Sequence, residues 1–371
     1  KWLSFGGWIN AVIPVLIVPY YSVIGGWVIK YLVEYFRGNA KLLAEDGYFT
    51  NFISNGVSTE LCFVAFCAFT LIIIFAGVQN GIERVSKIMM PILIVLSVII
   101  AVYSVTRPGA LAGVKYFLVP NVKNFSWMTV VSAMGQMFYS LSIAMGILIT
   151  FGSYMKKDTA IEDSTRNVEV FDTGIAIMAG LMIIPAVFAF SGGDPDTLQA
   201  GPSLMFITIP KVFQNMGFGT VIGIVFFLLV LFAAVTSSIA LTESAVSTFE
   251  DELGWGRKKA TVLVGVIMLV LGSLSSLGYG PLAGIKIIGM QFLDLFDFLT
   301  NSVMMPIAAL LTSLLVSRVV GIDKIEEEII HGESAFRRKK VFVVMIKYLC
   351  PVFAIIILLS SVANALGWIK M

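Results

Sequence analysis

The sequence is poor in charged residues, histidine and cysteine, and each shortage excludes a class of function. Only 13% of its 371 residues are Asp, Glu, Lys or Arg, whereas an average soluble domain has about 25%. Together with 58% hydrophobic residues, this excludes a soluble enzyme. A net charge of +2 leaves no basic surface for nucleic acid, and the single histidine, His331, leaves little for acid–base or metal chemistry. We therefore predict that the protein is not an enzyme and binds no nucleic acid.

The sequence also lacks the cysteine pattern of a disulfide-bonded protein. Its three cysteines, Cys62, Cys67 and Cys350, all lie in apolar runs. Such positions are typical of small buried side chains, so no disulfide framework is expected.

Long apolar runs dominate what is present. A helix needs about 20 apolar residues to cross about 30 Å of hydrocarbon. Runs of this kind lie at 8–36, 61–79, 86–106, 127–154, 164–191, 218–249, 259–278, 287–318 and 341–366. They are apolar on every face, unlike the alternating strands of a membrane barrel. We predict an all-α membrane protein with nine transmembrane helices in a single domain, residues 1–371.

The distribution of Lys and Arg between the runs predicts the orientation in the membrane. If the first helix runs from inside to outside, more basic residues fall in the inner loops, among them the cluster at 337–340. Because inner loops are enriched in Lys and Arg, this is the favoured orientation. Nine crossings then leave the C-terminus outside.

Two places put hydroxyl or small residues at membrane depth, where polar groups are costly and therefore candidates for function. Residues 136–146, QMFYSLSIAMG, support a helix poorly and could open into non-helical backbone that binds a cation or a substrate. Close helix packing through small residues is the alternative. Thr236, Ser237 and Ser238 place three hydroxyls within one turn, and such oxygen ligands suit Na⁺. Hydrogen bonds to carbonyls one turn earlier are the alternative for these hydroxyls.

Carboxylates mark the other candidates. Asp172 lies about 12 Å into the fifth run by helical rise, where it must find a cation, a proton or a partner. Asp294 and Asp297, three residues apart on one helical face, could form a gate with a basic group or reach the headgroups. Asp251 could pair with a base at the inner end of the sixth run, although exposed charge is common at a helix terminus. His331 lies in a charged segment, 321–340, which reads as a solvated loop with a short helix.

Several segments resemble a known family. These are WINAVIPVLIVPYYSVIGGW (8–27), GQMFYSLSIAMGILITFGSYMKKD (135–158) and LFAAVTSSIALTESAVSTFEDELG (231–254), supported by DTGIAIMAGLMIIPAVFAF (172–190) and FLDLFDFLTNS (292–302). In this order, over essentially the whole chain, they resemble the bacterial neurotransmitter:sodium symporters of the LeuT fold. The resemblance implies that the nine runs match helices 3 to 11 of the eleven-helix members, in a bacterial inner (plasma) membrane.

The resemblance departs at the start of the chain. The family's first two helices, including a glycine-rich broken helix with an Asn-x-Trp-Arg-Phe-Pro-like motif, have no counterpart here, and the chain opens with Lys1 rather than Met. Two helices and their flanks are about 70 to 80 residues at family spacing. We therefore expect a longer parent protein and an inactive fragment, with a native short form as the alternative.

The resemblance also implies two sodium sites. One uses the carbonyl of Ala233 and the hydroxyls of Thr236 and Ser237. The second, next to the substrate, uses Ser140 and Asp172. Because the carboxylate of Asp172 supplies a negative charge that chloride provides in some relatives, the coupling is expected to be independent of chloride.

A substrate pocket is implied between these sites. Its expected contacts are Ile17, Tyr21, Tyr139, Ser140, Ser142, Met145, Ser238 and Leu241. The Tyr21 hydroxyl would bind the substrate carboxylate, and carbonyl groups near 139–142 would hold the amino group. The other end of the pocket is apolar, and burying about 100 Å² of side chain there is worth roughly 2.5 kcal/mol, which favours a hydrophobic or aromatic amino acid.

The family also has two gates. The outer gate pairs an arginine with the residue matching Asp297, and the inner gate pairs another arginine with the residue matching Asp251, near Tyr154. We predict Na⁺-coupled symport of a small hydrophobic or aromatic amino acid by the parent protein. A proton-driven or exchange-driven carrier of the same fold, or a membrane protein without transport activity, is the alternative, and no oligomeric state is predicted.

Overall fold

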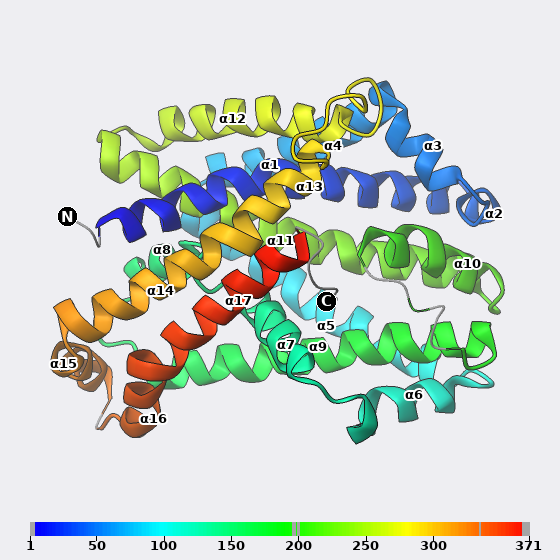
Figure 1. The fold of residues 1–371 in the computed structure, drawn as a ribbon. Helices are drawn as coiled ribbons and strands as arrows, with labels where there is room; N and C mark the ends of the chain where they lie inside the picture. Colours follow the sequence, from blue (N-terminus) through cyan, green and yellow to red (C-terminus); the bar gives the residue numbers. More distant parts are fainter. Residues whose placement is uncertain (1–3, 195–197, 199–200, 334, 366–371) are drawn as a thin grey trace.

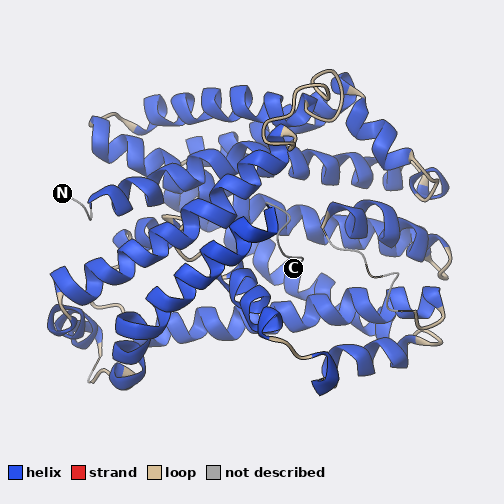
Figure 2. Ribbon diagram, viewed as in Figure 1, coloured by secondary structure: helices blue, strands red, loops and turns tan. Residues whose placement is uncertain are grey.

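The structure is a bundle of helices. This computed structural model describes residues 4–194, 198, 201–333 and 335–365. Within that part every regular element is helical, apart from an isolated β-bridge between Ile287 and Met290 (Figure 2). The all-α prediction is therefore confirmed for the described residues.

The helices follow one another with short connections (Figure 1). The first are α1 (Ser4–Phe36), α2 (Ala40–Leu43), α3 (Tyr48–Ser54), α4 (Gly56–Phe75), α5 (Arg84–Val105) and α6 (Ala110–Leu118). The middle ones are α7 (Trp127–Ser140), α8 (Ile147–Ser153), α9 (Ile161–Ser191), α10 (Ile209–Gln214), α11 (Gly219–Leu253) and α12 (Arg257–Leu277). The last are α13 (Phe292–Asp297), α14 (Met305–Leu315), α15 (Ile322–Gly332), α16 (Lys339–Val344) and α17 (Cys350–Ala365).

Short helical turns of other types extend several of these helices. π-helical turns are η1 (Val78–Glu83), η4 (Leu204–Thr208), η5 (Phe298–Met304), η6 (Val316–Val320) and η7 (Met345–Leu349). A single 3₁₀ turn, η2 (Val122–Asn124), precedes α7. The π-helical turns join neighbouring α-helices into longer rods, such as 292–320 and 339–364.

Eight of these helical segments, counted over the described residues, are long and apolar enough to cross a membrane. The expected count of nine is not confirmed, because the fourth apolar run, 127–154, does not form one continuous helix. It divides into α7 and α8, each too short to cross alone. The other runs correspond to the eight segments.

α1 is the most buried of the spanning helices. It is apolar on all sides, as expected for a helix surrounded by protein, and it packs against α4, α11 and α12. In its second half, Trp27 and Tyr31 make edge-on ring contacts with Phe49 and Phe206, and Tyr31 stacks on Phe227. These aromatic contacts fix α1 against α3, η4 and α11.

The two ends of the bundle differ. Figure 1 shows the start of α1 at the same end as α8, α15 and α16, whereas α2, α6 and α10 lie at the opposite end. The charged segment that contains α15 therefore shares one end of the molecule with the start of α1, as the alternating crossings require. His331 lies in the last turn of α15, so the expected short helix is present.

Close contact between α1 and α4 depends on glycine. A β-carbon on Gly26 would lie 2.7 Å from the backbone nitrogen of Phe63 and 2.8 Å from the carbonyl carbon of Cys62. Both neighbours are backbone atoms, which cannot rotate away.

We expect Gly26→Ala to destabilise the protein by about 1 to 3 kcal/mol, because an extra methyl group in a tightly packed contact forces the helices apart. The measurement is the apparent melting temperature of the purified protein in detergent. The matched control is Gly7→Ala on the same helix, because a β-carbon there meets nothing within 4 Å. Equal melting temperatures for the two variants would contradict the close-contact argument.

Candidate functional site

A break in the helix organises the site. α7 ends at Ser140 and α8 begins at Ile147. Between them the backbone turns through left-handed conformations, with φ of 54° at Ser142, 59° at Ala144 and 74° at Gly146. Such conformations cost about 1 to 2 kcal/mol for a residue other than glycine, so surrounding contacts must hold them. The structure confirms that this stretch opens into non-helical backbone.

The break leaves carbonyl groups without helical partners. The carbonyls of residues 140–145, all within the described chain, accept no backbone hydrogen bond, whereas Gly146 accepts one from Thr150 at 3.0 Å. Free carbonyls at membrane depth are tolerated only where protein or a cavity surrounds them. They are suitable ligands for a cation or an ammonium group.

Glycine allows the break to lie against its neighbours. A β-carbon on Gly146 would lie 2.8 Å from the carbonyl oxygen of Asn10 in α1 and 2.9 Å from the Ser244 hydroxyl in α11. A nearby hydrogen bond from Thr150 to Ser244, 3.2 Å long, ties α8 to α11. The break is therefore held between α1 and α11.

A cavity of about 460 Å³ opens beside the break. It is lined by Ile17, Tyr21, Met90, Gln136, Tyr139, Ser140, Ser142, Met145, Ile147, Thr236, Ser237, Ala240 and Leu241. The structure thus brings together seven of the eight expected substrate contacts, one of which, Ser140, is also an expected sodium ligand. Two further expected sodium ligands, Thr236 and Ser237, line the same cavity. Of the lining residues without such an expectation, Gln136 could have been found as a polar side chain in an apolar run. Nothing distinguishes Met90, Ile147 and Ala240 from other residues of their runs.

Ser238, the eighth expected contact, lies elsewhere. Its side chain is fully buried, and its hydroxyl lies 3.2 Å from that of Thr70 in α4. A helix turns by about 100° per residue, so the face that carries Thr236 and Ala240 to the cavity carries Ser238 towards α4. The structure gives no support to a contact between Ser238 and a ligand in this cavity.

The hydroxyl of Thr236 lies among carbonyl oxygens. It donates to the carbonyls of Phe232 and Ala233, both at 3.0 Å. Two of the expected ligands of one sodium site, Ala233 and Thr236, are therefore adjacent. The neighbouring Ser237 interacts with the Tyr21 side chain, which joins this group to the cavity.

The carboxylate of Asp172 contacts the end of α7, where the helix break begins. The hydroxyl of Ser140 donates to its carboxylate at 2.5 Å. Since Asp172 lies on α9 and Ser140 is the last residue of α7, this hydrogen bond connects α9 to the point where the helix opens. The two expected ligands of the second sodium site are thus in direct contact.

Polar side chains also gather around Asp294 and Asp297. Asp297 accepts hydrogen bonds from Tyr20 at 3.2 Å and from Asn301 at 2.6 Å. Asp294 accepts one from Tyr279 at 3.0 Å. Both carboxylates are therefore bound by neutral groups, and no ion pair of Asp297 occurs within the described residues.

On α11, Glu243 carries a hydrogen-bond network that was not predicted from the sequence. It is fully buried, and Arg257 donates to both of its oxygens, at 2.9 and 2.5 Å. Tyr154 donates to the same carboxylate at 2.8 Å. An acidic residue inside an apolar run is a signal that could have found Glu243. Asp251, the residue expected beside Tyr154, is exposed and makes no ion pair with any described residue.

Comparison with known proteins decides the family. The sequence profile of the sodium:neurotransmitter symporter family matches residues 49–368. The chain belongs to this family. The family resemblance of the sequence is thereby confirmed, and the family is one of sodium-coupled transporters rather than of enzymes.

Curated relatives agree with this membership. The chain is 34% identical over 360 residues to YhdH of Bacillus subtilis (strain 168), described as an uncharacterized sodium-dependent transporter, covering 96% of this chain and 79% of the relative. It is 30% identical over 354 residues to an uncharacterized sodium-dependent transporter of Haemophilus influenzae, covering 93% of this chain and 76% of the relative. These matches extend over most of the chain and do not support the expected absence of two helices.

A solved structure shares the fold. The crystal structure of MhsT in complex with L-phenylalanine superposes with a TM-score of 0.84 at 33% sequence identity, covering 97% of this chain and 82% of that one. The expected LeuT-type bundle is consistent with this neighbour. With its long apolar helices, the chain is a multi-pass membrane protein.

The buried ion pair at Glu243 predicts an asymmetric effect of mutation. We expect Arg257→Leu to destabilise the protein by about 3 to 5 kcal/mol, because it leaves a buried carboxylate without its counter-charge. The double variant Arg257→Leu/Glu243→Leu should be more stable than Arg257→Leu alone. Thermal unfolding in detergent measures both, with Lys258→Leu, at an exposed position beside Arg257, as the control. A double variant less stable than Arg257→Leu would contradict the pairing.

Proposed function

We propose that this protein performs Na⁺-coupled symport of a small hydrophobic or aromatic amino acid. The observation that carries the proposal is the cavity beside the helix break, where free carbonyl groups, a tyrosine hydroxyl and the Thr236–Ser237 hydroxyls face one space. These groups have the chemistry to bind a zwitterion and an alkali ion together. A sodium-dependent family and a similar structure with bound L-phenylalanine support this function.

The substrate is proposed to lie along the break. Its ammonium group would contact the carbonyls near 139–142, of which those from residue 140 onward accept no backbone hydrogen bond. Its carboxylate would accept a hydrogen bond from Tyr21. Ile17, Met145 and Leu241 supply an apolar wall for the side chain. A charged side chain would lose its hydration there without compensation.

Two sodium ions are proposed on either side of the substrate. One would bind Ala233 and Thr236 with Ser237, so that the present hydrogen bond from Thr236 to the Ala233 carbonyl gives way to ion coordination. The other would bind Ser140 and Asp172, whose side chains already meet. The carboxylate of Asp172 supplies local negative charge, so transport is proposed to be independent of chloride.

Coupling follows from differential affinity. An ion shifts a conformational equilibrium only by the difference in its affinity for the two states. The proposed sodium site at Ser140 and Asp172 spans two helical segments, α7 and α9. Occupation therefore favours the state in which these segments stay together, and ion release on the inner side permits the other state.

The proposed orientation places the start of α1 and the α15 segment inside and the C-terminus outside, in a bacterial inner membrane. Asp297 is then proposed as part of an outer gate, and Tyr154 with Asp251 as part of an inner one. In the structure Tyr154 binds Glu243 instead, so we include Glu243 and Arg257 in the inner gate.

The sodium assignment is tested by removing hydroxyls from the protein. Thr236→Val and Ser237→Ala should each abolish Na⁺-dependent amino-acid uptake into proteoliposomes, because each removes an oxygen ligand while preserving the size of the side chain. The control is Thr242→Val, which removes a hydroxyl bonded to the carbonyl of Ser238 at 2.7 Å on the same helix. It should retain Na⁺-dependent uptake.

Two outcomes would contradict the sodium assignment. One is normal sodium dependence in both Thr236→Val and Ser237→Ala. The other is wild-type uptake that continues when Na⁺ is replaced by choline, which would favour proton-driven or exchange-driven transport. Dependence of uptake on chloride would contradict the role given to Asp172.

The substrate assignment is tested at Tyr21. We expect Tyr21→Phe to raise the KM for a hydrophobic amino acid about tenfold to a hundredfold, because a hydrogen bond to a charged group is worth about 1.5 to 3 kcal/mol. Tyr35→Phe is the matched control, since the hydroxyl of Tyr35 is buried in the same helix and makes no hydrogen bond to any described residue. Competition of radiolabelled phenylalanine by unlabelled amino acids measures the preference. Equal KM values for the two variants, or stronger competition by lysine or glutamate than by leucine, would count against the proposed pocket.

A further inference from the structure

Two helices at the inner end lack caps of their own. The first residue before α9 is Ala160, which has no side chain that can accept a hydrogen bond from the first turn. The residue before α16 is Arg338, whose side chain makes no cap either. Because α16 continues through η7 into the last spanning segment, Lys339–Asn364, both uncapped ends belong to long helices.

Each helix end donates hydrogen bonds to a carboxylate of the other segment: Glu333 at the start of α9, and Glu162 just before α16. Glu333, which follows α15, accepts hydrogen bonds from the backbone nitrogens of Glu162 at 2.6 Å and Asp163 at 3.3 Å. In return, the carboxylate of Glu162 accepts hydrogen bonds from the backbone nitrogens of Arg337 at 2.9 Å and Arg338 at 3.1 Å. Neither end can keep its cap if the two segments separate.

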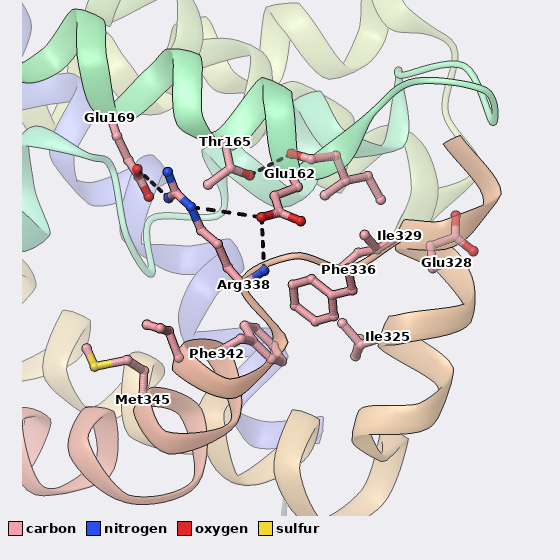
Figure 3. A pocket seen from close by; sticks show the side chains of 12 residues that line it. Glu162, Thr165, Glu169, Ile325, Glu328, Ile329, Phe336, Arg338, Phe342 and Met345 are labelled. Carbon is pink, nitrogen blue, oxygen red and sulfur yellow. Dashed lines mark hydrogen bonds and ion pairs between the residues drawn. The ribbon is translucent and has the colours of Figure 1, made fainter. Parts of the chain in front are cut away.

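A further ion pair crosses the junction between α9 and the residues just before α16. Figure 3 shows the Arg338 side chain extending to Glu169 on α9, with a separation of 2.8 Å, while its backbone bonds to Glu162. At the other side of the junction, a β-carbon on Gly332 would overlap the carbonyl group of Thr159. The backbone contact between Gly332 and Thr159 and the ion pair between Arg338 and Glu169 thus add to the hydrogen bonds of the two caps.

Apolar packing contributes little to this junction. The side chains between α9, α15 and α16 leave a cavity of about 470 Å³, lined mainly by apolar residues such as Ile325, Ile329 and Phe342 (Figure 3). A junction that contains such a void lacks the contacts of a packed core. The hydrogen bonds therefore contribute to its attachment beside the apolar contacts of Ile329, and they can be exchanged for bonds to water when the segments part.

We propose that Glu162 and Glu333 are positioning residues that form a reciprocal latch between α9 and the segment joining α15 to α16, and that this latch opens when the inner side of the carrier opens. This inference rests on the proposed function, because α9 also carries Asp172, one of the proposed sodium ligands. From Glu162 to Asp172 the helix is continuous, so a shift of its first turn moves Asp172 relative to the break.

Hydrogen exchange of the full chain in lipid nanodiscs tests the coupling without reference to transport. Glu333→Ala should raise exchange about tenfold at 162–163, which is the effect of losing a helix cap, and should also raise it severalfold at 337–338, whose own acceptor is unchanged. Glu162→Ala should raise exchange at both places as well. Glu327→Ala, an exposed carboxylate on α15 without an ion pair in the described chain, is the control and should change neither. An increase confined to 162–163 in Glu333→Ala would overturn the latch.

A second variant separates the latch from simple stabilisation of α9. Ala160→Ser in the Glu333→Ala background gives α9 a cap of its own, since a serine at this position accepts hydrogen bonds from the amides two and three residues later, which are those of Glu162 and Asp163. Exchange at 162–163 should return to that of the wild type, whereas exchange at 337–338 should stay raised. The rate of amino-acid uptake, which we expect Glu333→Ala to change, should still differ from that of the wild type. Recovery of the wild-type uptake rate would show that only helix stability matters and would overturn the proposal.

The link to transport is tested with sodium. In the wild type, replacing K⁺ by Na⁺ should slow exchange at 162–163 and at 337–338 together, at least threefold. Equal exchange in both salts, in a protein that does take up amino acid with Na⁺, would overturn release of the latch during transport. If uptake itself proves independent of Na⁺, the proposed function fails, while the coupling between the two segments is still decided by the variants.

Discussion

The absence of hydrogen-bonding partners in lipid governs this structure. Backbone groups within the bilayer must be satisfied inside the protein, so a helix can be interrupted only where other elements enclose the interruption. Here α1 and α11 enclose it, and Gly146 permits their close approach. The same enclosure that makes the break tolerable also creates a polar space within an apolar bundle, and the candidate site follows from it.

The carboxylates at membrane depth obey the same constraint. Glu243 is bound by Arg257 and Tyr154, Asp172 by Ser140, and Asp297 by Tyr20 and Asn301. Of these three carboxylates, only Glu243 is compensated by a full positive charge. Asp172 and Asp297 are held by neutral donors and so retain capacity to attract a cation, and Asp172 lies directly at the break.

Features that depend on residues close together in the chain could be predicted from the sequence. The apolar runs predicted the spanning helices, and the small residues around Ser140 and Ser142 predicted the break, because both depend on residues close together in the chain. The sequence did not predict which face of a helix turns towards the cavity. Ser237 and Ser238 are neighbours in the sequence, yet only Ser237 lines the cavity. The rotation of α11 is set by packing against α1 and α4, which a list of runs does not contain.

Contacts between segments far apart in the chain were the hardest to predict from the sequence. The pair Glu243 and Arg257 depends on how α11 turns into α12, and the mutual caps of Glu162 and Glu333 join residues about 170 positions apart. Glu162 and Glu333 read in the sequence as ordinary charges near helix ends. Glu243 lies inside an apolar run, but nothing in the sequence identifies Arg257 as its partner. The nine-helix expectation exceeded the eight long segments for a related reason, since counting apolar residues does not detect that the run 127–154 is divided.

The central position of α1 has a consequence for biosynthesis. Its main partners include α11 and α12, which begin only at Gly219 and Arg257. A ribosome must therefore deliver most of the chain before α1 acquires its final neighbours, and until then that helix has to reside in the membrane surrounded by lipid tails. Its mostly apolar surface suits it to both environments, whereas the side chain of Asn10 acquires its partner Thr312 only when α14 is in place.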